Sequence, residues 1–356
     1  MYALKVLIIA VWIALVAAQQ QSYLGFNSGA TLDDNKAKQQ ADFEKEFKAA
    51  QGLHGSPGSF NSVRLYTNIQ FGTTDTPISA FQAAIATNTS MLLGIWCSGT
   101  KGITSELNAL QSAISQYGQK FVDLVVGISV GSEDLYRISE TGIENKAGVG
   151  TGPKEIVDFI KLVRSSIANT PLSKKPVGHV DAWSAWDNSS NSAVIEAVDF
   201  VGTDLYPYYE NDKGNTFSNA TNVFNYIYYK TLSAAGDKPV WITETGWPVS
   251  GPTFGQAEAS VDNAKGYWDQ TGCSLFGRAN VWWYTLLDSN PANKEKFAIT
   301  KDLSTTPLFN LTCPAGSGAP PSINNDAKSA ASTVAITLSL TYMGAYALLG
   351  LICLSI

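Results

Sequence analysis

Two glutamates at the ends of predicted strands carry the clearest chemical signal in the sequence. Glu244 closes the apolar run "PVWITE", and the strand stops there because Gly246 frees the backbone and Pro248 lacks a donor. Glu133 closes a second apolar run, "LVVGISVGSE". A charge is costly inside a core but useful at the C-terminal end of a strand. Two facing carboxylates suit cleavage of a glycosidic bond, in which one protonates the leaving oxygen and the other attacks the anomeric carbon.

The neighbour of Glu133 offers an alternative acid. Asp134 follows it directly, but side chains alternate along a strand, so the two carboxylates are expected to point to opposite sides. This alternation favours Glu133 as the functional group. The ordinary alternative for each glutamate is a structural role at the end of a strand.

The ends of the other predicted strands add hydrogen-bonding and aromatic side chains. A sugar presents an apolar face and a polar rim, so this mixture suits a sugar-binding mouth. The candidate substrate-binding residues are Asn27, Arg64, Tyr66, Ser132, Asp181, Asp204, Tyr206, Trp247 and Trp283. Arg64 also suits an ion pair inside a barrel, a role compatible with orienting a carboxylate. Tyr206, Trp247 and Trp283 suit core packing as well as sugar contact.

Eight short apolar runs, rich in β-branched and aromatic residues, are the elements that must position these side chains. They cover residues 23–29, 62–67, 91–97, 124–133, 175–183, 200–209, 238–246 and 280–288. Helical or loop segments separate them, which predicts an α/β fold, a (β/α)8 TIM barrel, with its active mouth at the C-terminal ends of the strands. A doubly wound open sheet is the alternative. It usually has fewer strands and a Gly-rich phosphate loop, and the sequence contains no such loop.

The N-terminus predicts export. Lys5 precedes an apolar run of about 13 residues, which is too short to span a bilayer and typical of a signal peptide covering residues 1–18. A membrane anchor is the alternative. Residues 19–313 fit one catalytic domain in size, and the linker after them, 314–325, is rich in Gly, Pro and Ser.

The C-terminus predicts a glycosylphosphatidylinositol (GPI) anchor. A small-residue set begins at Asn325, a polar spacer follows, and the uncharged stretch 334–356 runs to the end of the chain. This order predicts lipid attachment at Asn325 and removal of residues 326–356. A plain transmembrane helix is the alternative, although no cytoplasmic residues follow the tail. We therefore expect a secreted protein held on the outer face of the cell membrane, and in the cell wall, by the GPI lipid.

Sequons and cysteines agree with an exported protein. The predicted N-glycosylation sites are Asn88, Asn188, Asn219 and Asn310. Cys273 and Cys313 flank a late segment, so a disulfide between them would close a loop of roughly 40 residues. Cys97 lies in the apolar run "LLGIWC", which favours a buried free thiol. The sequence leaves the pairing open.

Charge and composition bound the partners. The net charge is −6 with a pI of about 5.0, and no basic stripe is present, which argues against nucleic acid. The only two histidines, His54 and His179, are far apart, and no metal-ligand spacing appears. We therefore expect no metal and no cofactor, and a monomer.

Three stretches resemble glycoside hydrolase family 17, the β-1,3-glucanases. "WITETGWP" (241–248) is similar to the family signature, "VGISVGSEDLYR" (126–137) to the acid/base segment of its fungal members, and "DLYPYY" (204–209) to its strand-six motif. The resemblance covers essentially all of residues 19–313. Together with the predicted GPI tail, it is a resemblance to fungal GPI-anchored cell-wall endo-β-1,3-glucanases.

This resemblance implies endo-hydrolysis of cell-wall β-1,3-glucan with retention of configuration, Glu244 acting as nucleophile and Glu133 as general acid/base. Ser132 departs from the wider clan, where many relatives place an Asn that binds the sugar 2-hydroxyl. Serine is shorter, so this contact is lost, bridged by water or supplied elsewhere. Two other functions stay open: a β-1,3-glucan transglycosylase, and a non-catalytic glucan-binding wall protein on the same fold.

Overall fold

The computed structural model describes residues 22–318. The predicted signal peptide, the GPI site Asn325 and the tail 326–356 lie outside the described residues, as does Cys353. Within the described part of the chain, no helix is both long and apolar enough to cross a membrane.

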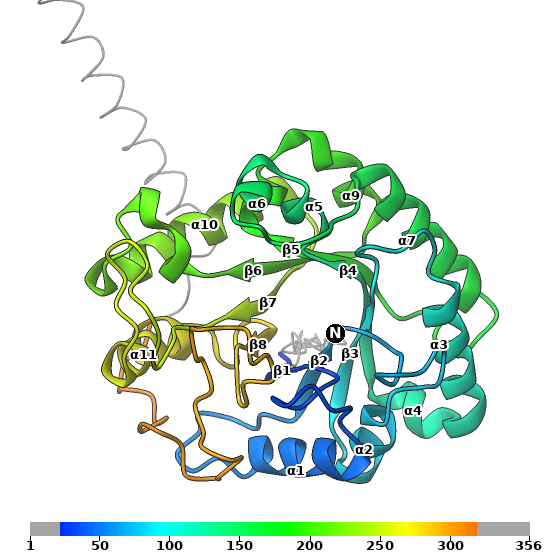
Figure 1. Ribbon diagram of the computed structural model, residues 1–356, viewed down its shortest axis with the longest axis horizontal. Coiled ribbons are helices and arrows are strands. Elements are labelled where there is room, and N and C mark those ends of the chain that lie inside the picture. Colours follow the sequence, from blue (N-terminus) through cyan, green and yellow to red (C-terminus); the bar gives the residue numbers. More distant parts are fainter. Residues whose placement is uncertain (1–21, 319–356) are drawn as a thin grey trace, which may run out of the picture.

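Eight parallel strands close into a barrel in chain order, with β8 returning to pair with β1 (Figure 1). The strands are β1 (Leu24–Ser28), β2 (Ser62–Leu65), β3 (Ser90–Ile95), β4 (Val125–Ser132), β5 (Val177–Ala182), β6 (Phe200–Leu205), β7 (Val240–Thr245) and β8 (Val281–Trp283). The predicted (β/α)8 barrel is thereby confirmed. All eight strands are shorter than the predicted runs, and β6 and β8 differ most: β6 stops at Leu205, because Pro207 opens a 3-10 turn, and β8 stops at Trp283.

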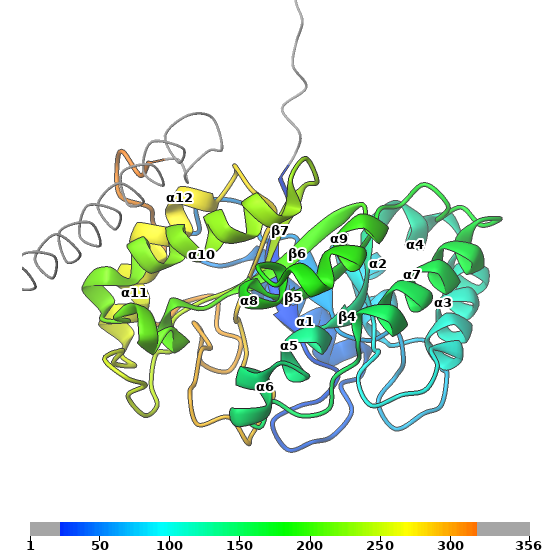
Figure 2. The ribbon, with the colours of Figure 1, turned by 90° about the horizontal axis from the view of Figure 1, so that it is seen from above.

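Helices surround the barrel, as the two views in Figures 1 and 2 show. They are α1 (Gln40–Gln51), α2 (Ala80–Thr87), α3 (Thr104–Tyr117), α4 (Gln119–Leu124), α5 (Asp134–Arg137), α6 (Glu140–Glu144), α7 (Pro153–Ile167), α8 (Trp183–Trp186), α9 (Ser192–Ala197), α10 (Ala220–Ala235), α11 (Val261–Tyr267) and α12 (Cys273–Leu275). In α7 the apolar stripe Ile156, Phe159, Ile160 and Val163 is buried, and Pro153 begins the helix.

Apolar side chains are buried in two regions, one outside the barrel wall and one inside it. The outer region lies between the strands and the helices and consists of two large clusters. A smaller cluster closes the interior of the barrel, and Phe200 and Trp241 stack within it with ring centroids 3.8 Å apart. Above this closed floor, the interior is lined by polar side chains, which are described with the site below.

A disulfide ties the C-terminal segment to the barrel. Cys273, the first residue of α12, is bonded to Cys313, 40 residues further along the chain. Trp268 Nε1 donates to the carbonyl oxygen of Leu311 nearby, at 2.9 Å. Cys97 is a buried free thiol. Because α12 leads into the start of β8, the described chain ends near the N-terminal face of the barrel, on the side away from α5 and α6 (Figure 2).

Candidate active site

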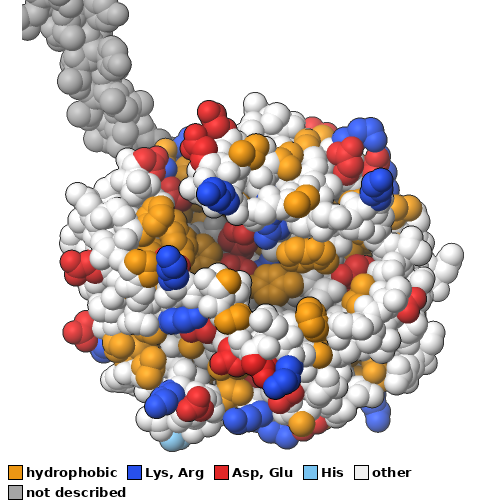
Figure 3. Space-filling view, viewed as in Figure 1, with side chains coloured by type: hydrophobic (Ala, Val, Ile, Leu, Met, Phe, Trp, Pro, Cys, Tyr) orange, Lys and Arg blue, Asp and Glu red, His pale blue; other side chains and the backbone are white. Residues whose placement is uncertain are grey.

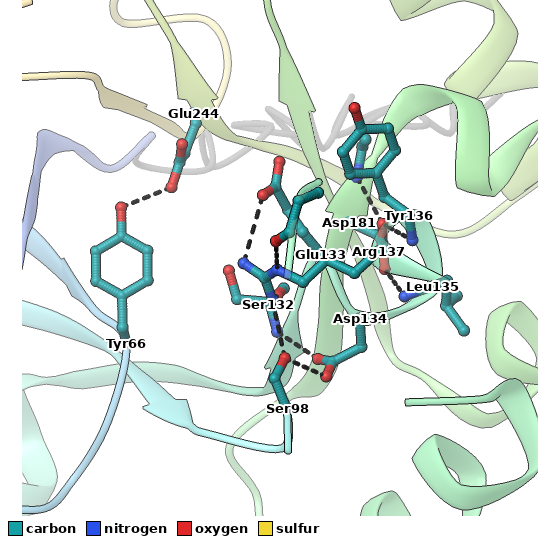
Figure 4. A network of polar contacts seen from close by, with 12 residues as sticks. Tyr66, Ser98, Ser132, Glu133, Asp134, Leu135, Tyr136, Arg137, Asp181 and Glu244 are labelled. Atoms are coloured by element: carbon teal, nitrogen blue, oxygen red, sulfur yellow. Dashed lines mark hydrogen bonds and ion pairs between the residues drawn. The ribbon is translucent and has the colours of Figure 1, made fainter. Parts of the chain in front are cut away.

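Glu133 and Glu244 lie at the same end of the barrel. Glu244 is the last residue but one of β7, and Glu133 directly follows the last residue of β4. In parallel strands both positions belong to the C-terminal mouth. Figure 3 shows this face hollowed near its centre, with acidic, basic and hydrophobic side chains in the hollow, and Figure 4 shows the two glutamates there.

Three donors converge on the carboxylate of Glu244. Arg64 Nη1 lies 2.5 Å and Tyr66 Oη 2.6 Å from Oε1, and Tyr206 Oη lies 2.6 Å from Oε2. A carboxylate only accepts hydrogen bonds, so this set suits an ionised group and fixes its orientation. Burial raises the pKa of Tyr66 and Tyr206 well above the usual value, and the Glu244 charge raises both further. Both hydroxyls therefore keep the protons that they donate.

Glu133 lies on a tight turn between β4 and α5. Its φ of 56° is left-handed, a conformation that is uncommon for a residue with a side chain and is often found at functional sites. Its backbone N–H donates to Val180 of β5 at 2.9 Å, which holds the turn in place. Gly131, two residues earlier, has a φ of 88°, and a Cβ there would lie only 2.4 Å from Asp134 Oδ2. Glycine is therefore required for this approach.

Burial and, after it, the negative charge of Glu244 raise the pKa of Glu133 to about 7. The guanidinium of Arg137 acts in the opposite direction, with Nη2 at 3.6 Å from Glu133 Oε2. The two glutamates thus have opposite surroundings. Glu244 is surrounded by donors, whereas Glu133 holds its proton near neutral pH. Such a divided pair suits one acid and one nucleophile.

Asp134 is excluded from the mouth, but not for the predicted reason. It is the first residue of α5 and no longer part of the strand, so strand alternation does not apply. Its side chain turns away beneath the mouth, where Oδ2 accepts from the N–H of Ser132 at 2.9 Å and Oδ1 accepts from Ser98 Oγ at 2.6 Å (Figure 4). Asp134 is completely buried and stabilises the turn that carries Glu133.

A buried polar layer lies under Glu244. Arg64 is 1% exposed, and besides Glu244 it donates to Asn27 Oδ1 and Ser132 Oγ, both at 2.9 Å. Both amide hydrogens of Asn27 are used on backbone carbonyls of β7 and β8. Burial, then the Glu244 charge, raises the pKa of Asp204 well above its usual value. Asn27, Arg64 and Asp204 therefore support the site from inside the barrel, and contact between these residues and the substrate stays a prediction.

Three further residues predicted to bind substrate lie outside the barrel wall. Trp247 and Trp283 are each 2% exposed and pack among aromatic rings between strands and helices, Trp283 against Trp268 at 5.0 Å. Asp181 is completely buried under α5, where it accepts the backbone N–H groups of Leu135 and Tyr136. Their burial outside the barrel argues against direct sugar contact. Tyr66 and Tyr206, which are partly exposed, remain at the mouth, and Ser132 lies at its edge with its hydroxyl on Arg64.

Sequence reasoning missed several residues around the mouth. Arg137 pairs with Glu133 from one turn further along the chain and lies over the ring of Trp96, 5.4 Å from its centroid. Glu133 and Arg137 are four residues apart, a spacing that could have predicted this ion pair from the sequence. Glu106 of α3 accepts from Thr67 Oγ1 and the N–H of Asn68, so it holds the chain that follows β2 and Tyr66. Burial raises the pKa of Glu106 to about 7.

The sequons differ in accessibility. Asn88, Asn188 and Asn310 are exposed. Asn219 is only partly exposed, and its Nδ2 donates to the carbonyl oxygens of Lys213 and Gly214 at 3.2 and 2.8 Å. Among residues 22–318, no three His, Cys, Asp or Glu side chains are grouped so that they could hold a metal ion.

A closed parallel barrel with an acid and a donor-bound carboxylate at its C-terminal mouth is the arrangement that many glycoside hydrolases use. The chain belongs to the family described as BtgE/BtgC glycoside hydrolase domain, whose family model matches residues 25–301.

Relatives in fungi share most of this domain. A protein of Aspergillus oryzae named as a probable glucan endo-1,3-beta-glucosidase is 56% identical over 84% of this chain and 64% of its own length. A protein of Aspergillus niger with the same name is 53% identical over 86% and 66%. The chain thus spans slightly less than two thirds of these relatives. A Saccharomyces cerevisiae protein named glucan 1,3-beta-glucosidase is 30% identical over 71% of this chain and 76% of its own length.

Solved structures agree on the fold. The glycoside hydrolase family 17 β-1,3-glucanosyltransferase of Rhizomucor miehei superposes with a TM-score of 0.66 at 24% identity, covering 82% of this chain and 98% of its own. An active-site mutant of that enzyme in complex with laminaritriose gives a TM-score of 0.63 at 23% identity.

Proposed function

We propose that this chain is a retaining endo-β-1,3-glucanase of the family 17 type, which cleaves β-1,3-glucosidic linkages in cell-wall glucan. The observation that carries the proposal is the divided pair at the mouth. Glu133 is half-buried and keeps its proton, while Glu244 is bound by Arg64, Tyr66 and Tyr206. The names of the fungal relatives support a β-1,3-glucan substrate.

The proposed reaction has two steps. In the first, Glu133 donates its proton to the glycosidic oxygen as that bond breaks, and a Glu244 oxygen forms an ester bond to the anomeric carbon. In the second, Glu133, now ionised, takes a proton from water, whose oxygen displaces Glu244. Two inversions at the same carbon restore the β configuration. Tyr66 and Tyr206 hold the attacking carboxylate in one orientation throughout.

Hydrolysis of laminarin, followed by NMR of the first products, tests the proposal. We expect β-configured products that convert slowly to the α form. The first appearance of α products would contradict retention, and no hydrolysis by the folded protein would favour a glucan-binding wall protein. Products longer than the substrate at high oligosaccharide concentration would show that a sugar hydroxyl replaces water, as in a transglycosylase.

Chemical rescue assigns the two roles. With an activated aryl β-glucoside of laminaribiose, azide should accelerate Glu133→Ala and give a β-azide, because the small anion needs no base. Azide should rescue Glu244→Ala with an α-azide, because it attacks the anomeric carbon directly. If the two stereochemical results were exchanged, the assignments of nucleophile and acid/base would have to be exchanged too.

We also propose that the enzyme is secreted and held on the outer membrane face and in the cell wall by a GPI lipid at Asn325. The sequence pattern supports this, namely the small residues, the spacer and a tail of hydrophobic residues. Phosphatidylinositol-specific phospholipase should release the protein from membranes. A mature C-terminal peptide containing residues 334–356 would instead show a membrane-spanning tail.

A further inference from the structure

The buried histidine of β5 has an acceptor at each of its ring nitrogens. His179 is completely buried, with Nδ1 at 2.5 Å from the carbonyl oxygen of Val130 and Nε2 at 2.9 Å from Asp181 Oδ2. A backbone carbonyl has no hydrogen to give. The Nδ1 contact therefore requires a hydrogen on Nδ1. What remains is whether Asp181 is a carboxylate or a carboxylic acid.

Asp181 is surrounded by backbone donors that favour a carboxylate. Its Oδ2 accepts from Leu135 N at 2.8 Å, and its Oδ1 accepts from Tyr136 N at 3.0 Å and Ala182 N at 2.9 Å. Three backbone N–H groups thus donate to its two oxygens, and such hydrogen bonds favour the ionised carboxylate over the acid. The Nε2 contact then requires a hydrogen as well. With hydrogens on both nitrogens, His179 is an imidazolium cation.

This pair holds the chain on both sides of Glu133. The Val130 carbonyl lies three residues before Glu133, and the N–H groups of Leu135 and Tyr136 lie two and three residues after it. Figure 4 shows Asp181 under the first turn of α5, with both of these contacts drawn. Neither side chain touches the mouth. His179 packs edge-on against Trp186 of α8, with ring centroids 5.5 Å apart.

We propose that His179 and Asp181 form a buried imidazolium–carboxylate pair that positions Glu133 for proton transfer, an inference that rests on the proposed function. Three hydrogen bonds from this pair, to Val130, Leu135 and Tyr136, fix the left-handed turn from both sides. Without them the turn can relax and move the acid away from the glycosidic oxygen. A displacement of about 1 Å in such a site is worth about 10²-fold in rate.

The surrounding charges agree with a cationic ring. Burial alone lowers the pKa of His179, but the hydrogen bond and charge of Asp181 and the charge of Asp134 raise it above the usual value. Asp134 approaches the ring from α5, since a Cβ at Gly131 would contact both side chains. Glu133 and Arg137, the other charged groups nearby, belong to the same turn and to α5. The two carboxylates that face the imidazolium are therefore Asp181 and Asp134.

The charge on His179 can be measured in the unmodified protein. The chain has two histidines, and the other, His54, is exposed and serves as an internal reference. In ¹⁵N NMR of the labelled protein, His179 should show a hydrogen on each of its two ring nitrogens at pH 7. A neutral His179 ring at pH 7 would overturn the proposal.

Kinetics test the positioning role. Asp181→Asn should lower kcat/KM on laminarin by about 10²-fold. On a dinitrophenyl laminaribioside, whose leaving group needs no acid, bond cleavage should be nearly unchanged. Azide should then accelerate turnover of this variant and yield a β-azide, as for Glu133→Ala. His179→Gln should behave in the same way, and His54→Gln, the matched control, should equal wild type.

Two results would refute the positioning role. One is wild-type activity of folded Asp181→Asn on laminarin, and the other is an equal loss on both substrates without azide rescue. If Glu133→Ala itself showed no rescue, the acid/base assignment would fail rather than the pair, and the NMR measurement would still decide the charge of His179. The NMR measurement also decides the proposal if the His179 variants do not fold.

Discussion

Arg64 donates from Nη1 to Glu244 Oε1 at 2.5 Å and from Nη2 to Ser132 Oγ at 2.9 Å. A single guanidinium therefore links the strand of the proposed nucleophile to the strand of the proposed acid. Because it is planar and has several donors, an arginine can make both contacts at once, whereas a lysine has a single nitrogen. The relative position of the two catalytic strands depends on this side chain.

Replacement of Arg64 should affect stability and activity together. Arg64→Met leaves the Glu244 charge buried without its cation, so we expect the free energy of unfolding to fall by about 3–5 kcal/mol. Arg64→Lys should keep more stability but lose about 10²-fold in kcat/KM, since the contact to Ser132 is lost. Urea denaturation and laminarin kinetics measure both. The control is Arg164→Met, which breaks the exposed pair with Asp199 and should cost less than about 1 kcal/mol. If Arg64→Met lowered the free energy of unfolding by no more than Arg164→Met does, the Arg64–Glu244 pair would not stabilise the fold as a buried ion pair.

Activity should fall as the pH rises through about 7, because Glu133 must be protonated to act as an acid and its pKa is raised to about 7. Above this value, kcat/KM on laminarin should drop about tenfold per pH unit. Glu133→Gln, assayed on an activated substrate, should remove this limb. Glu106→Gln, at a second buried carboxyl whose pKa is about 7, is the control and should leave the limb in place.

The same two carboxyls predict a slope in stability. Their folded-state pKa of about 7 lies above the ordinary value of 4.5, so the folded protein binds more protons than the unfolded chain between these values. The free energy of unfolding should therefore decrease as the pH rises from about 4.5 to about 7. Each Gln variant should flatten this slope, and a slope unchanged in both variants would contradict the raised pKa values.

Removal of the Cys273–Cys313 disulfide should lower stability. The bond closes a loop of 40 residues, for which the chain-entropy relation gives about 4 kcal/mol. Cys273→Ser with Cys313→Ser should lower the free energy of unfolding by this order and leave kcat/KM unchanged, because the bond lies far from the mouth. Cys97→Ser is less suitable as a control, since Cys97 is buried. Reduction of the wild-type protein should instead reproduce the effect, and no change on reduction would argue against a stabilising bond.

The sequons should be used unequally. Both hydrogens of Asn219 Nδ2 are donated to backbone carbonyls, and a glycan on that nitrogen would replace one of them. Glycopeptide mass spectrometry of the secreted protein should find Asn219 unmodified, and glycans on some or all of the exposed Asn88, Asn188 and Asn310. A glycan on Asn219 in active protein would show that the local structure tolerates losing these bonds.

The sequence was sufficient to predict the eight strands and both glutamates, because apolar runs and strand ends are local features. The sequence was less informative about whether a side chain at a strand end faces into or out of the barrel. Asp181 and Trp283 are at the ends of strands as predicted, but both face outward, and the inward or outward direction depends on local register. The ladder between β4 and β5 shifts between Ser129 and Ser132, just before Glu133. A shift of this kind leaves no signature in composition, so the contacts of His179 and the place of Asp134 required the structure.

The disulfide at Cys313 also sets a polarity for the molecule. It fixes the end of the described chain near the N-terminal face of the barrel, whereas Glu133 and Glu244 open on the opposite face. With the proposed lipid at Asn325, the intervening chain would reach at most about 40 Å when fully extended. A short linker on the face opposite the active site would turn the mouth away from the membrane. The enzyme would then bind glucan chains on its wall-facing side and act only close to the bilayer.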